Sequence, residues 1–440
     1  MTSGSSSGPN ELRRDVGLFG AMMMGLGSIV GTGVFVSIGI AAGITGPSVV
    51  FAIVVAALVA TFNGLSSAQL AAQHPVSGGT YEYGYRWLSP SLGFAAGWMF
   101  LCAKSASAAT AALGFAGYAL QLFHVERTEW NVPLAFGAVV VISLLLLGGI
   151  RRSNWANIAI VSTTLISLAA FVLAGLPTVF REGASRMTPL FASSEAPTAM
   201  RQFLEACALM FVAYTGYGRI ATLGEEVHDP RRTIPRAIIL TLAVSSLLYV
   251  VVGGVAVAAS GTELLSGAVS QQAAPLQLVA DSLNVPLVGT LVSIGAVTAM
   301  LGVLLNLILG LSRVVFAMGR RGDLPSAAAN VSSTNATPTV AVVLVAIGVS
   351  GLTLIGDVKT TWSFSAFTVL VYYALTNLSA TRLTKEERLF SPVIPWLGLL
   401  SCLGLAFWVQ PKIWLIGLTL LIIGWAFQTL MRMLNARNVR

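Results

Sequence analysis

Long apolar stretches recur along the whole chain, and no other feature restricts the fold as strongly. A bilayer core is about 30 Å thick, so a spanning helix needs about 20 residues. Twelve stretches of roughly that length or longer are bounded by charged residues or by Pro and Gly clusters: 15–43, 46–72, 91–123, 131–149, 154–180, 199–226, 235–260, 285–319, 337–355, 358–381, 390–409 and 411–434. They leave no room for a separate soluble domain. With 55% hydrophobic and 10% charged residues, the sequence predicts an all-α integral membrane protein with 12 transmembrane helices.

The net charge of +8 is divided unevenly between the two sides of the predicted membrane region. If the stretches alternate in direction, sixteen basic residues fall on one side: Arg13, Arg14, Arg86, Arg151, Arg152, Arg231, Arg232, Arg236, Arg320, Arg321, Arg382, Lys385, Arg388, Arg432, Arg437 and Arg440. Six fall on the other: Arg127, Arg181, Arg186, Arg201, Lys359 and Lys412. Basic residues gather on the cytoplasmic side of membrane proteins, so both termini are expected in the cytoplasm of a multi-pass cell-membrane protein. This distribution does not suit nucleic-acid binding.

Glycine interrupts the first apolar stretch at residues 27–33 (GSIVGTG). Each glycine costs about 1 kcal/mol relative to alanine inside a helix, so this cluster predicts a break. Unwound backbone at membrane depth is tolerated where it lines a cavity, and free amides at the start of a half-helix favour a carboxylate. The sixth stretch has a similar interruption at residues 213–218 (AYTGYG). Close packing of small residues is the alternative, but two breaks at corresponding places favour a binding site.

The position of the second break predicts how the chain is divided. Five stretches precede the polar segment 181–198, and because five is odd, a second five-helix unit would enter from the opposite side as an inverted repeat. Segment 73–90 is expected at the cytoplasmic interface, and 261–284 as an outer connection with a short surface helix. The expected parts are a disordered tail at 1–14, a first repeat at 15–180, an outer loop at 181–198, a second repeat at 199–382, and helices 11 and 12 with the C-terminus at 383–440.

Four parts of the chain together resemble the amino acid-polyamine-organocation (APC) superfamily of secondary transporters. They are 27–39 (GSIVGTGVFVSIG), 75–83 (PVSGGTYEY), 211–216 (FVAYTG) with 225–235 (EEVHDPRRTIP), and 312–325 (SRVVFAMGRRGDLP). In this order and at these spacings they are specific, and the similarity covers about 16–390. The resemblance implies a five-plus-five inverted repeat like that of the bacterial leucine transporter, with discontinuous helices 1 and 6 and two extra C-terminal helices.

The resemblance also implies a substrate site at the two breaks. The backbone of residues 31–33 would hold a carboxylate, while carbonyls near Ile29 and at 212–214 would receive the α-amino group. Tyr214 and Tyr217 would line or cap the pocket, and the residues at 211 and 212 would form an apolar wall for small to medium side chains. The expected substrate-binding residues are Ile29, Gly31, Thr32, Gly33, Phe211, Val212, Tyr214, Gly216 and Tyr217.

Two positions depart from patterns within the superfamily. Some members carry a lysine in the fifth helix that stands in for a sodium ion; here it would fall near Thr164, and none is there. In cation-selective members the third helix has an acidic residue where Ala103 stands, and the next residue here is Lys104. The site is therefore shifted toward positive charge. Ser312 and Asn306 do not decide for or against a sodium site, so the coupling ion stays open.

Lys104 and Arg219 lie inside apolar stretches, where a charge costs about 2.5–3.5 kcal/mol. One hypothesis places the Lys104 amine beside the broken helices, where it exchanges a proton during transport. The alternative is a structural lysine bonded to carbonyls of the first helix. Arg219 directly follows the second break and is a candidate gate, with snorkelling to the cytoplasmic interface as the alternative. Glu225 and Glu226 follow and are further candidates for coupling or gating.

These features predict a secondary transporter of amino acids that works by alternating access, with protons as the candidate coupling ion. No acidic residue lies in the middle of an apolar stretch, so cationic side chains are disfavoured. A neutral amino acid is expected first and an acidic one second. The expected partners are the amino acid and the lipid bilayer.

Other functional classes fit less well. His74, His124 and His228 fall in loops far apart, and neither an HExxH motif nor a plausible nucleophile set is present, so an enzyme is not expected. No cofactor or metal is expected either. A channel would need a repeated filter loop or a ring of like charges. An amino acid exchanger, a substrate sensor with a transporter fold and a channel stay open as alternatives.

Overall fold

The computed structural model describes residues 16–76, 78–125, 128–149, 154–221, 227–272, 274–332 and 337–438. Within these ranges the chain is helical, and its only β pairing is an isolated bridge between Val16 and Val227. The helices of the first half are α1 (Leu18–Ile29), η1 (Gly33–Ser37), α2 (Ile38–Thr45), η2 (Gly46–Ser48), α3 (Val49–Gln73), α4 (Thr80–Trp87), α5 (Pro90–Leu122), η3 (Thr128–Trp130), α6 (Asn131–Leu147) and α7 (Asn154–Arg186).

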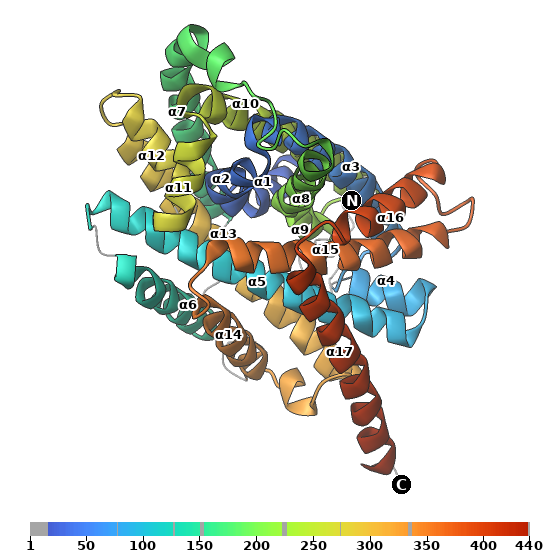
Figure 1. The fold of residues 1–440 in the computed structure, drawn as a ribbon. Helices are drawn as coiled ribbons and strands as arrows, with labels where there is room; N and C mark the ends of the chain where they lie inside the picture. The colour runs from blue at the N-terminus through green and yellow to red at the C-terminus, as the bar shows by residue number, and fades with distance from the viewer. Residues whose placement is uncertain are drawn as a thin grey trace, which may run out of the picture.

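The second half continues with helices of similar length. These are α8 (Ala196–Tyr214), η4 (Thr215–Tyr217), α9 (Gly218–Ala221), α10 (Pro230–Ser260), α11 (Thr262–Gln272), α12 (Pro275–Ser282), α13 (Val288–Arg321), η5 (Ser326–Ala329), α14 (Thr339–Thr353), α15 (Val358–Thr381), α16 (Val393–Ala406) and α17 (Pro411–Asn438). Figure 1 shows α5 crossing the centre of the molecule, and α13 and α15 pack along it. Helix α10 packs against α1, α3 and α7.

Seven helical segments of the described residues are long and apolar enough to cross a membrane, judged by length and composition. One of them, Leu18–Gln73, has 56 residues and contains two of the apolar stretches predicted from the sequence. The helices α14 and α16 have 15 and 14 residues, fewer than the roughly 20 that a straight span needs. The chain is therefore a multi-pass, all-helical membrane protein, and the count of twelve spans stays a prediction.

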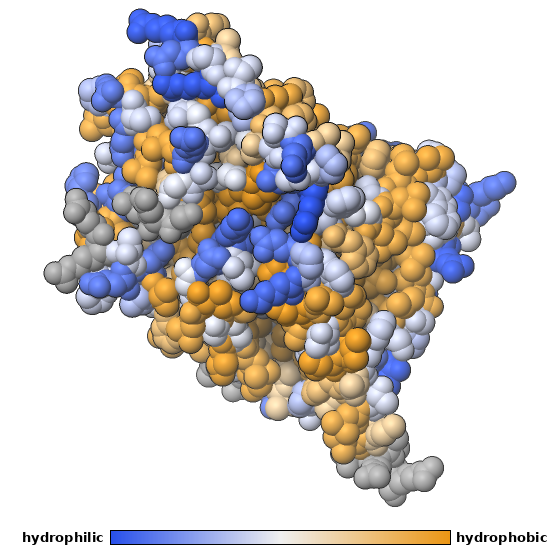
Figure 2. Space-filling view, viewed as in Figure 1, coloured by the Kyte–Doolittle hydropathy of each residue, from blue (hydrophilic) through white to orange (hydrophobic). Residues whose placement is uncertain are grey.

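Apolar side chains cover the outside of the helices, and polar ones lie within. Leu173 on α7, Leu247 on α10 and Leu400 on α16 are among the most exposed hydrophobic residues. Figure 2 shows broad apolar surface, for example over α14 and α17. Inside, the fully buried Asn377 donates from Nδ2 to Asn63 Oδ1 at 2.5 Å. Such a distribution suits lipid as the surrounding solvent. Polar groups such as these form hydrogen bonds in the interior, and apolar side chains on the outside can face lipid without contact with water.

Two connections differ from the sequence-based expectation. The predicted outer loop 181–198 begins later, because α7 continues to Arg186 and this residue pairs with Glu182 one turn earlier. Segment 261–284 forms two helices, α11 and α12, in place of one short surface helix. Leu265 and Leu276 on these helices are fully buried, and α11 packs against α2. The connection therefore forms part of the core.

The short helix α4 is fixed to distant parts of the chain by a buried carboxylate. Asp323, 3% exposed, accepts hydrogen bonds from Tyr81 Oη at 2.8 Å and Tyr85 Oη at 2.5 Å. Its other oxygen accepts from Gln428 Nε2 on α17 at 3.2 Å. Burial and the Asp323 carboxylate raise the pKa of Tyr85 to about 12, so this hydroxyl stays a donor. Arg321 pairs with Glu82 at 2.5 Å beside this group. We call Asp323 with its three partners the Asp323 cluster.

Replacing Asp323 with alanine is expected to lower thermal stability. The change leaves the hydroxyls of Tyr81 and Tyr85 without their acceptor, which costs about 1–3 kcal/mol for each group that water does not reach, while the Gln428 amide still donates to the Pro90 carbonyl. The measurement is the melting temperature in detergent. Glu386→Ala, which removes an exposed acid, serves as the control and is expected to melt like the wild type. Equal melting of Asp323→Ala and wild type would show that the cluster adds no stability.

Candidate functional site

The first helix is interrupted between α1 and η1. The chain leaves helical geometry at Val30, whose φ of −79° and ψ of 94° are extended. The amides of Val34 and Phe35 both donate to the Gly31 carbonyl at 3.1 Å and so restart the helix, which continues over Gly33–Ser37 as a π-helix with a wider turn. Beside this turn the hydroxyl of Thr32, a residue only 4% exposed, has no hydrogen-bond partner among the described residues. A buried hydroxyl of this kind is suited to a ligand.

The second interruption lies directly against the first. Helix α8 ends at Tyr214, the turn η4 follows, and the chain then continues as the short helix α9. A Cβ atom at Gly216 would collide with the carbonyl group of Ser28 and lie 2.7 Å from Ile29 Cγ1. Glycine is therefore needed here for close approach of two backbones. The two predicted breaks are both present, and they touch.

Tyr249 on α10 joins the two breaks, and the sequence did not single it out. Its hydroxyl lies 2.7 Å from the carbonyl oxygen of Ile29 and 3.3 Å from that of Ala213. Both carbonyls stand where a helix is interrupted, at the end of α1 and next to the end of α8. A lone tyrosine in the apolar stretch 235–260 was the available signal, but it is equally typical of core packing.

A cavity of about 120 Å³ lies where the breaks meet α5, α13 and α15. This volume is the space open to the centre of a water molecule, and one buried water needs about 10–15 Å³ of it. The cavity therefore holds roughly ten water-sized groups, enough for a small to medium amino acid. Of the predicted substrate residues, five line it: Ile29, Thr32, Gly33, Val212 and Gly216. Sequence reasoning missed other wall residues, such as Phe100, Ser107 and Trp362. The cavity also reaches Gly78 and Gly79 at the start of α4.

The other four predicted substrate residues are not among those that line the cavity. Gly31 packs against Val303, where a Cβ atom would lie 2.7 Å from a methyl carbon. Phe211 and Tyr217 pack on Tyr373, with ring centroids 5.7 and 5.4 Å away. Tyr214 points to α3, donating to the Ile53 carbonyl at 3.3 Å. The two tyrosines expected to line or cap the pocket are therefore core residues in this structure.

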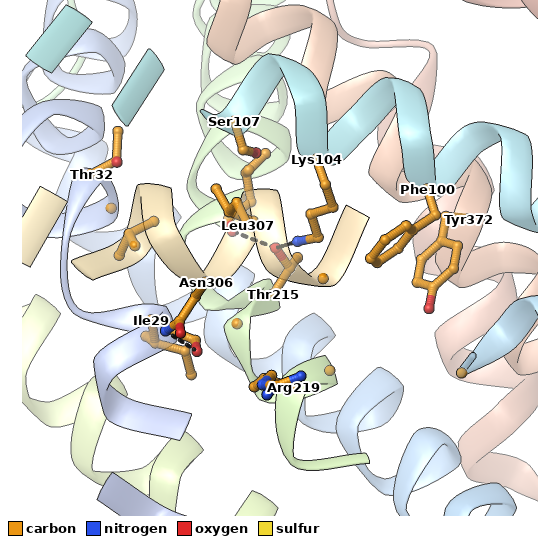
Figure 3. Close-up of a pocket in the computed structure, with 18 of the residues that line it drawn as sticks. Ile29, Thr32, Phe100, Lys104, Ser107, Thr215, Arg219, Asn306, Leu307 and Tyr372 are labelled. Carbon is orange, nitrogen blue, oxygen red and sulfur yellow. Dashed lines mark hydrogen bonds between the residues drawn. The ribbon is translucent and has the colours of Figure 1, made fainter. Parts of the chain in front are cut away.

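Lys104 reaches the cavity from α5 and contacts the second break (Figure 3). Its Nζ donates to Thr215 Oγ1 at 2.8 Å, and that hydroxyl donates to the Val212 carbonyl at 2.8 Å. The lysine is 8% exposed. The alternative expected from the sequence was a bond from Lys104 to carbonyls of the first helix. The partner observed is instead the hydroxyl of Thr215 at the second break.

Arginines line the same cavity. Arg219 on α9 and Arg313 on α13 are both part of its wall, and Figure 3 shows Arg219 below Thr215. Arg313 lies close to the end of the predicted stretch 285–319 and was not among the predicted site residues, but it lines the cavity. Glu225 and Glu226 lie outside the described residues. Among the described residues that line the cavity, none is acidic.

Two asparagines form hydrogen bonds to α1 on the N-terminal side of the first break. Asn157 on α7 donates from Nδ2 to the Met23 carbonyl at 2.8 Å, and Asn306 on α13 donates to Ser28 Oγ at 3.3 Å. Thr164, the position aligned with the lysine of some superfamily members, donates to Ile160 of its own helix at 2.8 Å. The polar contact between α7 and α1 is therefore made by Asn157, two turns before Thr164, and no sequence pattern indicated it.

Comparison with known proteins identifies the family. The profile of the amino acid permease family matches residues 20–437. An uncharacterized transporter of Mycobacterium tuberculosis is 39% identical over 399 residues, covering 91% of this chain and 87% of the relative. A branched-chain amino acid permease of Bacillus subtilis is 29% identical, covering 91% and 89%. Human cationic amino acid transporter 4 is 27% identical, covering 87% of this chain and 62% of the relative. The chain belongs to the amino acid permease family of the APC superfamily.

Proposed function

We propose that this chain is a secondary transporter that moves amino acids across the cell membrane by alternating access. The observation that supports this most directly is the cavity at the contact between two interrupted helices. Such breaks offer a zwitterion both kinds of partner, since half-helix starts present amides to a carboxylate and half-helix ends present carbonyls to an amine. The proposal includes a five-plus-five inverted repeat, with α16 and α17 as additional helices and both termini in the cytoplasm.

The proposed carboxylate site is the restart of the first helix, beside Thr32 and Gly33. The buried Thr32 hydroxyl would donate to the substrate together with backbone amides. The amine would approach the carbonyls of Ile29 and Val212. The Ile29 carbonyl accepts the Tyr249 hydroxyl and keeps a second lone pair, whereas the Val212 carbonyl accepts both the hydroxyl and the amide of Thr215, so the amine would share or replace one of these bonds. Gly31, Phe211, Tyr214, Gly216 and Tyr217 would support these groups through packing.

The proposed substrates carry no positive charge on the side chain. A cationic side chain would meet Lys104 and two arginines, and no acidic residue among the described lining residues. The human relative is named for cationic amino acids and the Bacillus subtilis one for branched-chain amino acids. Wall residues such as Phe100, Val212 and Trp362 suit the second class, so neutral amino acids are the first group to test.

Protons are the proposed coupling ion, with Lys104 as the group that exchanges them. Arg219, Glu225 and Glu226 are the proposed gate on the cytoplasmic side. For Arg219 this rests on its place in the cavity wall directly after the second break.

Uptake of radiolabelled amino acids into liposomes tests the function. We expect saturable uptake that prefers L-amino acids, and acceleration by an inward proton gradient. Uptake that requires a preloaded amino acid would favour an exchanger. Binding without transport would favour a sensor, and uptake without saturation would favour a channel.

A further inference from the structure

Lys104 brings a positive charge to the cavity, and its hydrogen-bond partner among the described residues carries no charge. Lys104, Arg219 and Arg313 all contribute to the cavity wall. Within the described part of the chain, the hydrogen-bond partner of the Lys104 ammonium is the hydroxyl of Thr215, which is neutral. Burying a charge without a counter-charge is costly, and an amine only 8% exposed has little water to replace one. An anionic group of the substrate would supply the missing counter-charge.

Two of the donor groups on the cavity wall lie at the two breaks. One is the unpartnered hydroxyl of Thr32 at the first break, and the other is the Lys104 ammonium at the second. Figure 3 shows them apart, with Leu307 between them in the view. A ligand with two carboxylates has one acceptor group for each of these donors.

The acceptors on the wall are already engaged in hydrogen bonds. The Ile29 carbonyl accepts from Tyr249, and the Val212 carbonyl accepts from Thr215. Tyr373 Oη lies 3.2 Å from the Thr215 carbonyl as well. The Ile29 carbonyl keeps one lone pair for an amine, but the Val212 and Thr215 carbonyls each accept a backbone amide as well, so little acceptor capacity is left on these three groups. Such a wall complements acceptor groups on a ligand more than donor groups.

We propose that the site selects acidic amino acids, which carry two carboxylates. The first carboxylate is held at the Thr32 break, as for any amino acid, and the second pairs with Lys104 and displaces or shares its bond to Thr215. Lys104 is then a specificity-determining residue. This inference rests on the proposed function, and it reverses the order in which neutral and acidic substrates are expected from the sequence.

Glutamate and glutamine form the discriminating pair, because their side chains match in size and differ in charge. Glutamine would leave the ammonium with a weaker, neutral acceptor. At low concentration we expect labelled L-glutamate to enter liposomes containing the full-length protein roughly 10- to 100-fold faster than labelled L-glutamine, the discrimination typical of a charged hydrogen bond.

Three variants assign the effect to Lys104. Lys104→Met is expected to bring the glutamate-to-glutamine ratio to about one or below, whereas Lys104→Arg keeps the charge and should keep the preference for glutamate. Lys359→Met removes an exposed positive charge at the start of α15 and should leave the ratio unchanged. Gel filtration shows whether each variant is folded, and the wild-type ratio decides the substrate class even if Lys104→Met is not.

The outcomes separate this inference from the proposed function. A wild-type protein that transports glutamine or leucine in preference to glutamate overturns the inference and leaves the function standing. A preference for glutamate that persists in a folded Lys104→Met variant overturns the role of Lys104. Failure to transport any amino acid overturns the proposed function, and the substrate class with it.

Discussion

Gly216→Ala is expected to abolish transport. The new methyl group would overlap the carbonyl of Ser28 and lie 2.7 Å from Ile29 Cγ1. A flexible side chain can move away, but the first of these obstacles is backbone at the end of α1. Overpacking of a core costs about 1–3 kcal/mol even where side chains can adjust. Here the two interrupted helices must separate, and the cavity between them changes shape. We expect uptake to fall to background while much of the fold remains.

The measurement pairs uptake with gel filtration and thermal melting. Gly254→Ala on α10 is the matched control, since a Cβ atom there would meet no atom within 4 Å. Alanine also favours a helix more than glycine does, so this control should transport normally and melt no lower than the wild type. Normal uptake by Gly216→Ala would mean that close contact of the two breaks is not required.

Tyr249→Phe is expected to reduce uptake by at least about tenfold and to lower the melting temperature. The ring is kept, but the carbonyls of Ile29 and Ala213 lose their donor. A buried polar group left without a partner costs about 1–3 kcal/mol, and about 1.4 kcal/mol corresponds to tenfold in an equilibrium. Part of this loss falls on the geometry of the site, because both carbonyls stand where the helices end.

Ser260→Ala provides the comparison on the same helix. Its hydroxyl bonds the Ala256 carbonyl, which lies within α10 and far along the chain from the breaks. We expect this variant to transport like the wild type. If Tyr249→Phe and Ser260→Ala behave alike, the hydroxyl between the two breaks has no special part in the site.

The interruptions of the first and sixth helices could be predicted because glycine has few uses in a membrane helix. The restart at Gly33 and the contact at Gly216 both lie within the stretches that the sequence pointed to. Glycine at position 33 also has a packing reason that the sequence did not indicate. A Cβ atom there would meet Tyr249 Oη and Ala213 Cβ at 2.6 and 2.8 Å, so a larger residue would disturb helix packing.

The direction of individual side chains could not be predicted. Tyr214 and Tyr217 flank a single turn of 3₁₀ geometry, and a small change in that turn decides whether they face the cavity or the neighbouring helices. Tyr249 and Asn157 each lie in an apolar stretch that holds several other polar residues, and their partners are main-chain carbonyls of another helix. A carbonyl has no residue type, so no sequence motif records such a bond.

The Asp323 cluster also bears on how the protein is handled in the laboratory. Gln428 belongs to the last helix, yet its amide reaches a carboxylate that holds α4, whose first turn follows the glycines beside the cavity. Shortening the chain before this glutamine, or fusing a bulky reporter close behind it, would act on a loop more than 300 positions earlier. Affinity tags and fluorescent fusions are therefore better placed at the opposite end of the polypeptide.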